Sequence, residues 1–309
     1  MDVLLQQILN GVVLGSIYAL IALGYTMVYG ILQLINFAHG DVLMVGALTA
    51  YTVVTLLNHV APDLYGPVKL VIGLIVAMPV CMLLNVAIER VAYRPLRNAP
   101  RLAPLITAIG VSIILQTLAM MIWGRNYKVF PPLLPSDPIA IGNATVTPTQ
   151  LIIIVTSIVV MLALVLLINR SKLGRAMRAT AENPRVAGLM GVDANKVIVA
   201  TFAIGAALAA LAGVMIAANY SIAHFYMGFM PGLKAFTAAV LGGIGNIYGA
   251  MVGGMLLGLI EALGAGYIGD LTGGVLGSHY QDIFAFIVLI VVLIFRPQGI
   301  MGERVADRA

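Results

Sequence analysis

Long stretches of this chain contain no acidic or basic side chain other than histidine. No Asp, Glu, Lys or Arg occurs between Asp2 and Asp41, in residues 102–124, or between Lys196 and Lys234. A helix needs about 20 apolar residues to span the hydrocarbon core of a bilayer, so each stretch can hold at least one membrane span. Only 9% of the 309 residues are charged, whereas soluble domains carry roughly a quarter. The sequence therefore predicts an all-α polytopic membrane protein.

The apolar stretches predict about eight membrane segments in a single domain covering residues 1–309. Six simple spans are expected at about residues 7–28, 41–57, 69–89, 102–124, 150–168 and 196–219. A last span is expected from about His279 to Phe295. The loop at residues 125–148 is rich in Pro, Asn and Thr and should lie outside.

Most of the 17 basic residues gather in three short segments. The segments hold Arg90, Arg94, Arg97 and Arg101; the basic residues of 170–196; and Arg296, Arg304 and Arg308. Lys and Arg beside membrane spans resist translocation, so all three segments should lie in the cytoplasm. This topology explains the formal charge of +5, and no nucleic-acid binding is expected.

The region before the last span requires two helices rather than one. Residues 220–278 must begin and end outside if the neighbouring spans are placed as above. Within this region, residues 241–254 read LGGIGNIYGAMVGG, which predicts a broken or re-entrant helix pair. Non-helical backbone at membrane depth is tolerated only where it is buried in protein or lines a cavity. The same count of crossings places the N-terminus outside.

Glycines recur at four-residue spacing in two of the apolar segments. The pairs are Gly11 with Gly15 and Gly249 with Gly253. In lipid, such pairs let helix backbones approach closely. They indicate either packing inside the bundle or a contact between subunits.

The polar segment from Arg170 to Lys196 carries the signals of a short cytoplasmic helix. Asn183-Pro184 is typical of a helix start, with Asn as the cap and Pro at the first helical position. Apolar residues then recur at helical spacing, at Val186, Ala187, Leu189 and Met190. Gly191 is placed to end this helix, and Asp193 to cap the membrane helix that follows.

We expect a helix over residues 178–191 to dock a partner and to transmit its movement into the spans. Val186, Leu189 and Met190 would form the apolar face of the helix. Arg178, Glu182 and Arg185 would make polar contacts beside that face. The alternative interpretation is an ordinary solvated basic loop.

Three polar residues interrupt the apolar sequence between the first two spans. They are Asn36, His39 and Asp41. An ionisable residue at membrane depth costs free energy unless it is paired or hydrated. The three residues therefore mark a possible translocation path. The alternative is a helix start at the membrane surface, capped by Asn36.

The glycine-rich break offers a second candidate for the path. Gly242, Gly243 and Asn246 would line it together with Gly245, although tight helix crossing explains the glycines equally well. Glu261 follows late in the same segment, and we interpret it as a residue of the membrane interface rather than a proton carrier.

No motif for catalysis or for metal binding is present. The four histidines are scattered, and neither GxSxG nor a Walker-type phosphate loop occurs. The single cysteine, Cys81, lies in an apolar run and is expected to be a packing residue. We therefore expect no catalytic residue, no metal and no cofactor in this chain.

Three stretches of the sequence resemble one family of membrane proteins. They are GSIYALIALGYTMVYGILQLINFAHGDVLMVGA at 15–47, GRAMRATAENPRVAGLMGVDANKV at 174–197 and AVLGGIGNIYGAMVGGMLLGLIE at 239–261. The chain is similar here to the permease subunits of bacterial branched-chain amino-acid ABC importers, of the LivH type. The three stretches cover about a quarter of the chain, while length and span layout agree throughout.

The resemblance implies the ABC importer permease fold and a set of partners. These are a second, LivM-like permease, two cytoplasmic ATPase subunits that bind ATP, a periplasmic substrate-binding protein and the lipid of the inner membrane. The cargo would be leucine, isoleucine or valine. The ATPase contact maps onto Arg178, Ala181, Glu182, Asn183, Arg185, Gly188, Leu189 and Gly191.

Other functions stay open on the sequence. Related permeases handle urea or short amides. An ion-driven carrier working alone would need buried ionisable residues, for which His39, Asp41 and Glu261 are the candidates. A membrane-embedded enzyme is disfavoured by the missing motifs.

Overall fold

Seven long apolar helices run through the computed structural model, which describes residues 2–97, 99–100, 102–135, 137–271 and 281–302. They are α1 (Asp2–Leu32), α2 (His39–Val60), α3 (Gly66–Ile88), α4 (Leu102–Trp123), α5 (Pro148–Arg170), α8 (Ala194–Tyr220) and α10 (Ile247–Leu271). Each of the seven can cross a membrane by length and composition. The all-α polytopic class is thus confirmed.

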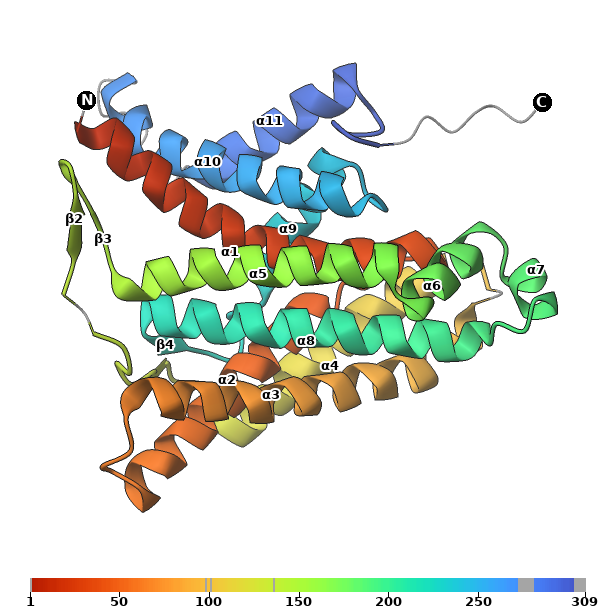
Figure 1. Ribbon diagram of the computed structural model, residues 1–309, viewed down its shortest axis with the longest axis horizontal. Helices are drawn as coiled ribbons and strands as arrows, with labels where there is room; N and C mark the ends of the chain where they lie inside the picture. Colours follow the sequence, from red (N-terminus) through yellow and green to blue (C-terminus); the bar gives the residue numbers. More distant parts are fainter. Residues whose placement is uncertain (1, 98, 101, 136, 272–280, 303–309) are drawn as a thin grey trace.

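Shorter elements complete the described chain (Figure 1). They are the π-helical η1 (Glu89–Tyr93), the 3-10 helix η2 (Arg94–Leu96), and the α-helices α6 (Lys172–Glu182), α7 (Pro184–Leu189), α9 (Phe229–Gly242) and α11 (Gln281–Phe295). Two antiparallel strand pairs join β1 (Lys128–Val129) to β4 (Ile222–Ala223) and β2 (Ile139–Ile141) to β3 (Ala144–Val146). His279, where the last span was expected to begin, lies outside the described residues.

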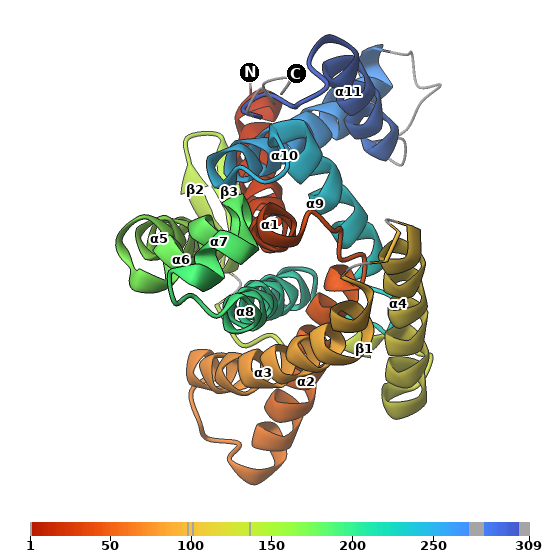
Figure 2. The same cartoon turned by 90° about the vertical axis from the view of Figure 1, so that its right-hand side faces the viewer.

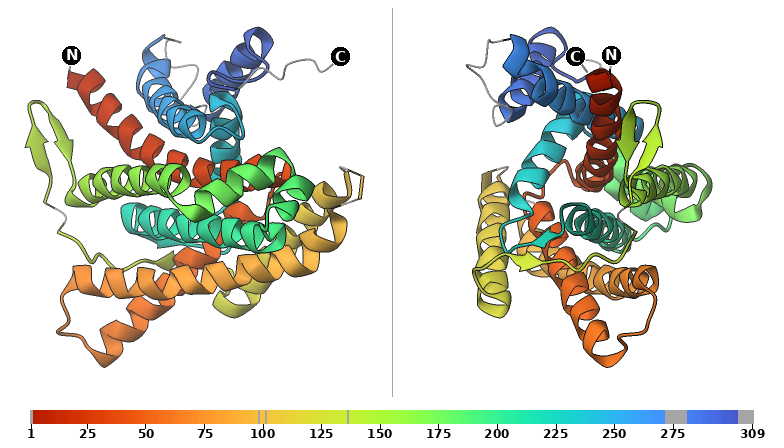
Figure 3. Two further views of the ribbon diagram at one scale, coloured as in Figure 1. Left: turned by 45° about the vertical axis from the view of Figure 1, so that its right-hand side comes forward. Right: turned by 90° about the vertical axis from the view of Figure 1, so that its left-hand side faces the viewer.

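The two ends of the bundle differ in charge. The helices α6 and α7 lie at one end, and the strands β2 and β3 lie at the other (Figures 1 and 3). The first end carries the described basic residues of the clusters around Arg94 and Arg178, so it is the cytoplasmic end. Arg101, Arg304 and Arg308 lie outside the described residues. The start of α1 is at the outer end, since the Gln6 side chain donates to the carbonyl of Thr145 in β3 at 3.1 Å.

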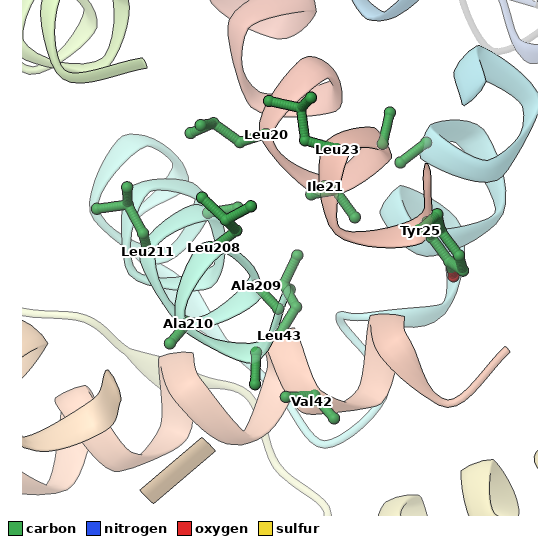
Figure 4. Packing of buried hydrophobic residues seen from close by; sticks show 14 of the residues in the cluster. Leu20, Ile21, Leu23, Tyr25, Val42, Leu43, Leu208, Ala209, Ala210 and Leu211 are labelled. Carbon is green, nitrogen blue, oxygen red and sulfur yellow. The ribbon is translucent and has the colours of Figure 1, made fainter. Parts of the chain in front are cut away.

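Helix α1 forms the centre of the core. Leu20, Ile21 and Leu23 are fully buried and face side chains of α8 and α2, among them Ala209 and Leu43 (Figure 4). The outer helices differ, because α4 and α5 expose many large apolar side chains to what would be lipid. A bundle that is apolar both inside and on its outer faces requires a hydrocarbon environment.

The glycine pairs pack helices of this chain against one another. A Cβ at Gly15 would lie 2.8 Å from the Met255 Cα, and one at Gly258 would lie 2.2 Å from the Gly15 backbone nitrogen. A Cβ at Gly253 would lie 2.1 Å from the Ala238 carbonyl oxygen. Both pairs therefore pack inside the bundle, which confirms that interpretation.

We expect Gly258→Leu to destabilise the protein, because a side chain there would push α10 away from α1. Overpacking of this kind costs about 1–3 kcal/mol or more. The matched control is Gly110→Leu in α4, where an added Cβ would meet nothing within 4 Å. Thermal unfolding in detergent should show a lower midpoint for Gly258→Leu alone; equal midpoints for the two variants would contradict the assigned packing.

The glycine-rich region contains the broken helix pair that the sequence predicts. Helix α9 has 14 residues and is ~21 Å long, which is shorter than the hydrocarbon core. It ends at Gly242, and α10 begins at Ile247. Between them Gly243 and Gly245 have φ angles of 110° and 96°, which favour glycine.

A C-terminal segment closes the break between α9 and α10. The backbone nitrogens of Ile300 and Met301 donate to the carbonyls of Leu241 and Gly242, each at 2.9 Å. The Asn246 amide donates to the Met301 carbonyl, also at 2.9 Å. These bonds satisfy backbone groups that the end of α9 leaves open.

Candidate functional site

The cytoplasmic segment 170–196 forms two helices, α6 and α7, rather than one. Ser171 caps α6 by accepting from the Gly174 nitrogen at 2.9 Å. Asn183 caps α7 by accepting from the nitrogens of Arg185 and Val186 at 3.0 and 3.2 Å. The predicted helix start at Asn183-Pro184 is confirmed, but a continuous helix over 178–191 is wrong, because the chain is extended at Asn183.

The expected ATPase-contact residues fall on both sides of this bend. Arg178, Ala181 and Glu182 lie in the last turns of α6, whereas Arg185, Gly188 and Leu189 lie in α7. Gly191 follows α7 with a φ of 84° and ends it, as predicted. Asp193 caps α8 by accepting from the Asn195 nitrogen at 3.0 Å, also as predicted.

Helix α7 exposes an apolar tip at the cytoplasmic end. Leu189 and Met190 are 87% and 81% exposed, and Val186 is 53% exposed. Ala187 is the member of the apolar set that turns inward, at 3% exposure. A contiguous patch of large apolar side chains on the surface is a candidate interaction site.

Helix α6 connects this tip to the membrane helices. A groove between α6 and the inner end of α1 is lined by Met177, Arg178, Ala181, Thr26 and Gly245, among others. The Arg178 guanidinium also donates to the carbonyl of Ile168 near the end of α5. Arg178 and Ala181 thus lie between the exposed tip and the break that follows α9.

The structure separates the three polar residues between the first two spans. Asn36 is 2% exposed; its carbonyl accepts from the Tyr93 hydroxyl at 2.8 Å, and its amide donates to Asn85 at 3.5 Å. His39 lies edge-on to Tyr25, with ring centroids 4.8 Å apart. Ala38, whose side chain makes no capping bond, is the N-cap of α2. A surface helix start capped by Asn36 is therefore wrong.

Asp41 lies at the edge of a cavity. The cavity measures about 100 Å³ and lies between the α1–α2 turn, α4 and α9. Its apolar walls include Tyr25, Phe37 and Phe229, and Ser112 lines it from α4. Figure 2 shows α9 next to the segment that joins α1 to α2, with α4 further to the right.

The glycines of the break lie elsewhere. Gly242, Gly243 and Asn246 do not line the cavity beside Asp41. A Cβ at Gly242 would lie 1.8 Å from the Gly249 carbonyl oxygen, so the backbones of α9 and α10 are in direct contact there. The Asn169 amide, at the inner end of α5, donates to Tyr248 at 2.9 Å. The break is therefore at the cytoplasmic end of the bundle.

An ion network that is buried at Lys234 and Glu261 and partly exposed at Asp282 joins α1, α9, α10 and α11. Lys234 in α9 lies 2.6 Å from Glu261 Oε1 and 2.7 Å from Asp282 Oδ1. The Tyr18 hydroxyl donates to Glu261 Oε2 at 3.0 Å. Glu261 is 2% exposed, so its interpretation as an interface residue is wrong. The sequence did not predict Lys234 as the partner of Glu261, although Lys234 is the first charged residue after a long uncharged stretch.

The cytoplasmic end contains a second buried carboxylate with a basic partner. Glu89 is fully buried in η1 and pairs with Arg97. Arg97 also donates to the Asn195 side chain at 2.6 Å, which ties the end of α3 to the start of α8. In the described part of the chain, no group of three or more His, Cys, Asp or Glu is placed to hold a metal ion.

Comparisons with known proteins agree on one family. The profile described as "Branched-chain amino acid transport system / permease component" matches residues 7–293. The chain is 47% identical over 303 residues to the high-affinity branched-chain amino acid transport system permease protein BraD of Pseudomonas aeruginosa, covering 97% of this chain and 96% of that protein.

Two further relatives extend the comparison. The permease protein LivH of the corresponding Escherichia coli K12 system is 45% identical over 304 residues, again covering 97% of this chain and 96% of LivH. A probable LivH protein of Methanocaldococcus jannaschii is 30% identical over 302 residues, covering 96% of this chain and 92% of that protein. No solved structure matches this chain significantly.

Proposed function

The chain belongs to the branched-chain amino acid transport permease family, and from this premise we propose that it moves leucine, isoleucine and valine across the membrane, driven by ATP on partner subunits. It is a multi-pass inner-membrane permease subunit of a branched-chain amino acid transport system. In the proposal, a second permease completes the translocation path, and a binding protein delivers the substrate. The chain itself carries out no catalysis.

The single observation that carries the coupling to ATP is the exposed tip of α7. It presents Leu189 and Met190 to the cytoplasm on a capped helix, at the end of the bundle that is rich in basic residues. An apolar patch with a charged rim is the anatomy of a protein–protein interface. Of the two cytoplasmic ATPase subunits, one for each permease, this surface would bind one.

Force from the ATPases would reach the core through α6. The groove between α6 and α1 brings Met177 and Ala181 close to Thr26 and to Gly245 at the break. A tilt of α7 would therefore displace the inner end of α1 and the α9–α10 hinge together. Packed interfaces shift between discrete arrangements rather than deforming continuously, so such a tilt would switch the bundle between outward and inward openings.

The carboxylates that are paired with a basic residue do not provide the exchangeable group that an ion-driven carrier working alone would need. Glu261 and Asp282 are held by Lys234, and Glu89 is held by Arg97. Carriers of that kind use ionisable groups that exchange a proton or cation with the solvent during transport. The paired carboxylates are better explained as structural ion pairs that stabilise the packing of the helices.

Reconstitution decides between these mechanisms. We expect proteoliposomes that contain the permease pair, the ATPases and the binding protein to import leucine only when ATP is present on the ATPase side. Liposomes with the isolated chain should show no uptake under a proton or sodium gradient. Competition with isoleucine should reduce leucine uptake and competition with urea should not. Gradient-driven leucine uptake by the isolated chain would refute the proposal, and urea import would redirect it to the amide permeases.

A further inference from the structure

Three carboxylates are buried among the described residues, and one of them has no basic partner there. Glu89 pairs with Arg97, and Glu261 pairs with Lys234. Asp41 is 2% exposed and forms no ion pair with any Lys, Arg or His of the described part of the chain. A carboxylate at membrane depth is costly unless a positive charge or water compensates it.

The surroundings of Asp41 are polar but uncharged. The Gln116 amide in α4 donates to Asp41 Oδ1 at 2.9 Å and lies 3.2 Å from the Ser112 hydroxyl oxygen. These groups come from a helix 75 residues further along the chain and hold the carboxylate at the cavity edge. An amide and a hydroxyl orient a carboxylate without neutralising it.

The walls of the cavity are chemically different from this polar edge. Tyr25, Phe37, Phe229 and Leu233 provide apolar and aromatic surface, and Gly40 and Gly228 let the two backbones approach closely at the cavity. A small pocket with apolar walls and a few fixed polar groups is the usual form of a small-molecule site. Here the polar groups would orient one end of the ligand, while the walls would receive an aliphatic portion.

We propose that Asp41 binds the α-ammonium group of the transported amino acid, with Gln116 and Ser112 positioning the carboxylate and the apolar walls receiving the side chain. The inference rests on the proposed function and names its substrate contact. A cavity of roughly 150 Å³ holds a benzene molecule. The present volume of about 100 Å³ therefore holds the ammonium end and first carbons of an amino acid. Admission of the remainder would require α4 and α9 to move apart.

The same site discriminates against substrates that carry no positive charge. Urea and short amides carry no positive charge, so they would leave the Asp41 carboxylate uncompensated in the membrane. Sites that hydrogen-bond a specific polar group reject analogues lacking it, because their own buried groups then remain unpaired. A desamino analogue such as 4-methylpentanoate, which keeps the side chain of leucine, should be rejected for the same reason.

The test uses the complete transport complex in proteoliposomes. Asp41→Asn should lower ATP-driven leucine uptake by about tenfold or more, because a buried charge pair loses one member, and Asp41→Glu should retain part of it. Asp63→Asn is the matched control, since Asp63 lies exposed in the loop between α2 and α3. Co-purification with the ATPases shows that each variant assembles. Uptake by Asp41→Asn at the wild-type rate would overturn the inference.

A second measurement keeps the inference testable if Asp41→Asn does not assemble. In the Ser112→Cys permease–ATPase complex, a membrane-permeant maleimide would label residue 112, while the native Cys81 is fully buried. Excess leucine should slow this labelling several-fold, and 4-methylpentanoate should not. No protection by leucine, or equal protection by both, would overturn the assignment. Failure of the wild-type complex to import leucine would instead refute the proposed function.

Discussion

Replacing Lys234 by Met is expected to lower the yield of folded protein to a small fraction of the wild-type yield. The lysine lies 2.6 Å from Glu261 and 2.7 Å from Asp282, and its loss leaves both carboxylates without a cation. Breaking a buried ion pair from one side costs about 3–5 kcal/mol, a large share of a typical stability of about 5–15 kcal/mol. The Tyr18 hydroxyl would be the remaining partner of Glu261 and carries no charge.

The measurement is the yield of monodisperse protein after detergent extraction, with the thermal unfolding midpoint of what remains. Lys196→Met is the control, because Lys196 has a side chain 86% exposed and lies 3.6 Å from Asp193, and exposed pairs contribute only about 0–1 kcal/mol. Adding Glu261→Gln to Lys234→Met should recover part of the lost stability. Wild-type yield and midpoint for Lys234→Met alone would show that the network contributes nothing.

Leu189→Asp is expected to abolish ATP-driven import while leaving the membrane bundle intact. Leu189 is 87% exposed, so its replacement disturbs no internal packing. In a docked complex, however, the new carboxylate would enter an apolar contact and lose its water. Disrupting an interface hot spot costs about 2 kcal/mol or more, which corresponds to roughly thirtyfold weaker ATPase binding.

Co-purification of the ATPases and ATP-driven uptake are the two readouts for this surface. Charge reversal at Glu182 or Arg185, beside the same apolar tip, should also leave insertion intact and uncouple transport. Val129→Asp provides the control, since Val129 is 74% exposed but lies in β1 at the outer end. If Leu189→Asp binds the ATPases like the control and imports normally, α7 is not the docking surface.

Local sequence signals predicted the features that depend on neighbouring residues. The cap at Asn183, the stop at Gly191 and the break after Gly242 each follow from the chemistry of a few adjacent positions. The apolar stretches likewise gave the long spans, because the length of a spanning helix is set by the bilayer. The bend that divides α6 from α7 was missed, although Ser171 has the chemistry of a cap for α6.

The partners of the buried polar groups could not be predicted from one sequence. Asp41 meets Gln116 across 75 residues, and Asn36 meets Tyr93 across 57. Local periodicity carries no information about which distant helix faces which. The same limit applies to Lys234, whose two carboxylate partners come from different helices. Sequence reasoning thus found Asp41 and Asn36 but could not separate a cavity residue from one held by hydrogen bonds.

The closure of the break by Ile300 and Met301 has a consequence for biosynthesis. The Asn246 side chain cannot form its hydrogen bond to the Met301 carbonyl until Met301 has been synthesised, 55 residues later in the chain. At roughly 5–20 residues per second, the delay lasts several seconds. Helix α10 is itself made during that interval, so the carbonyls of Leu241 and Gly242 are synthesised well before the nitrogens of Ile300 and Met301 that satisfy them, and the break can close only after both of its helices have been made.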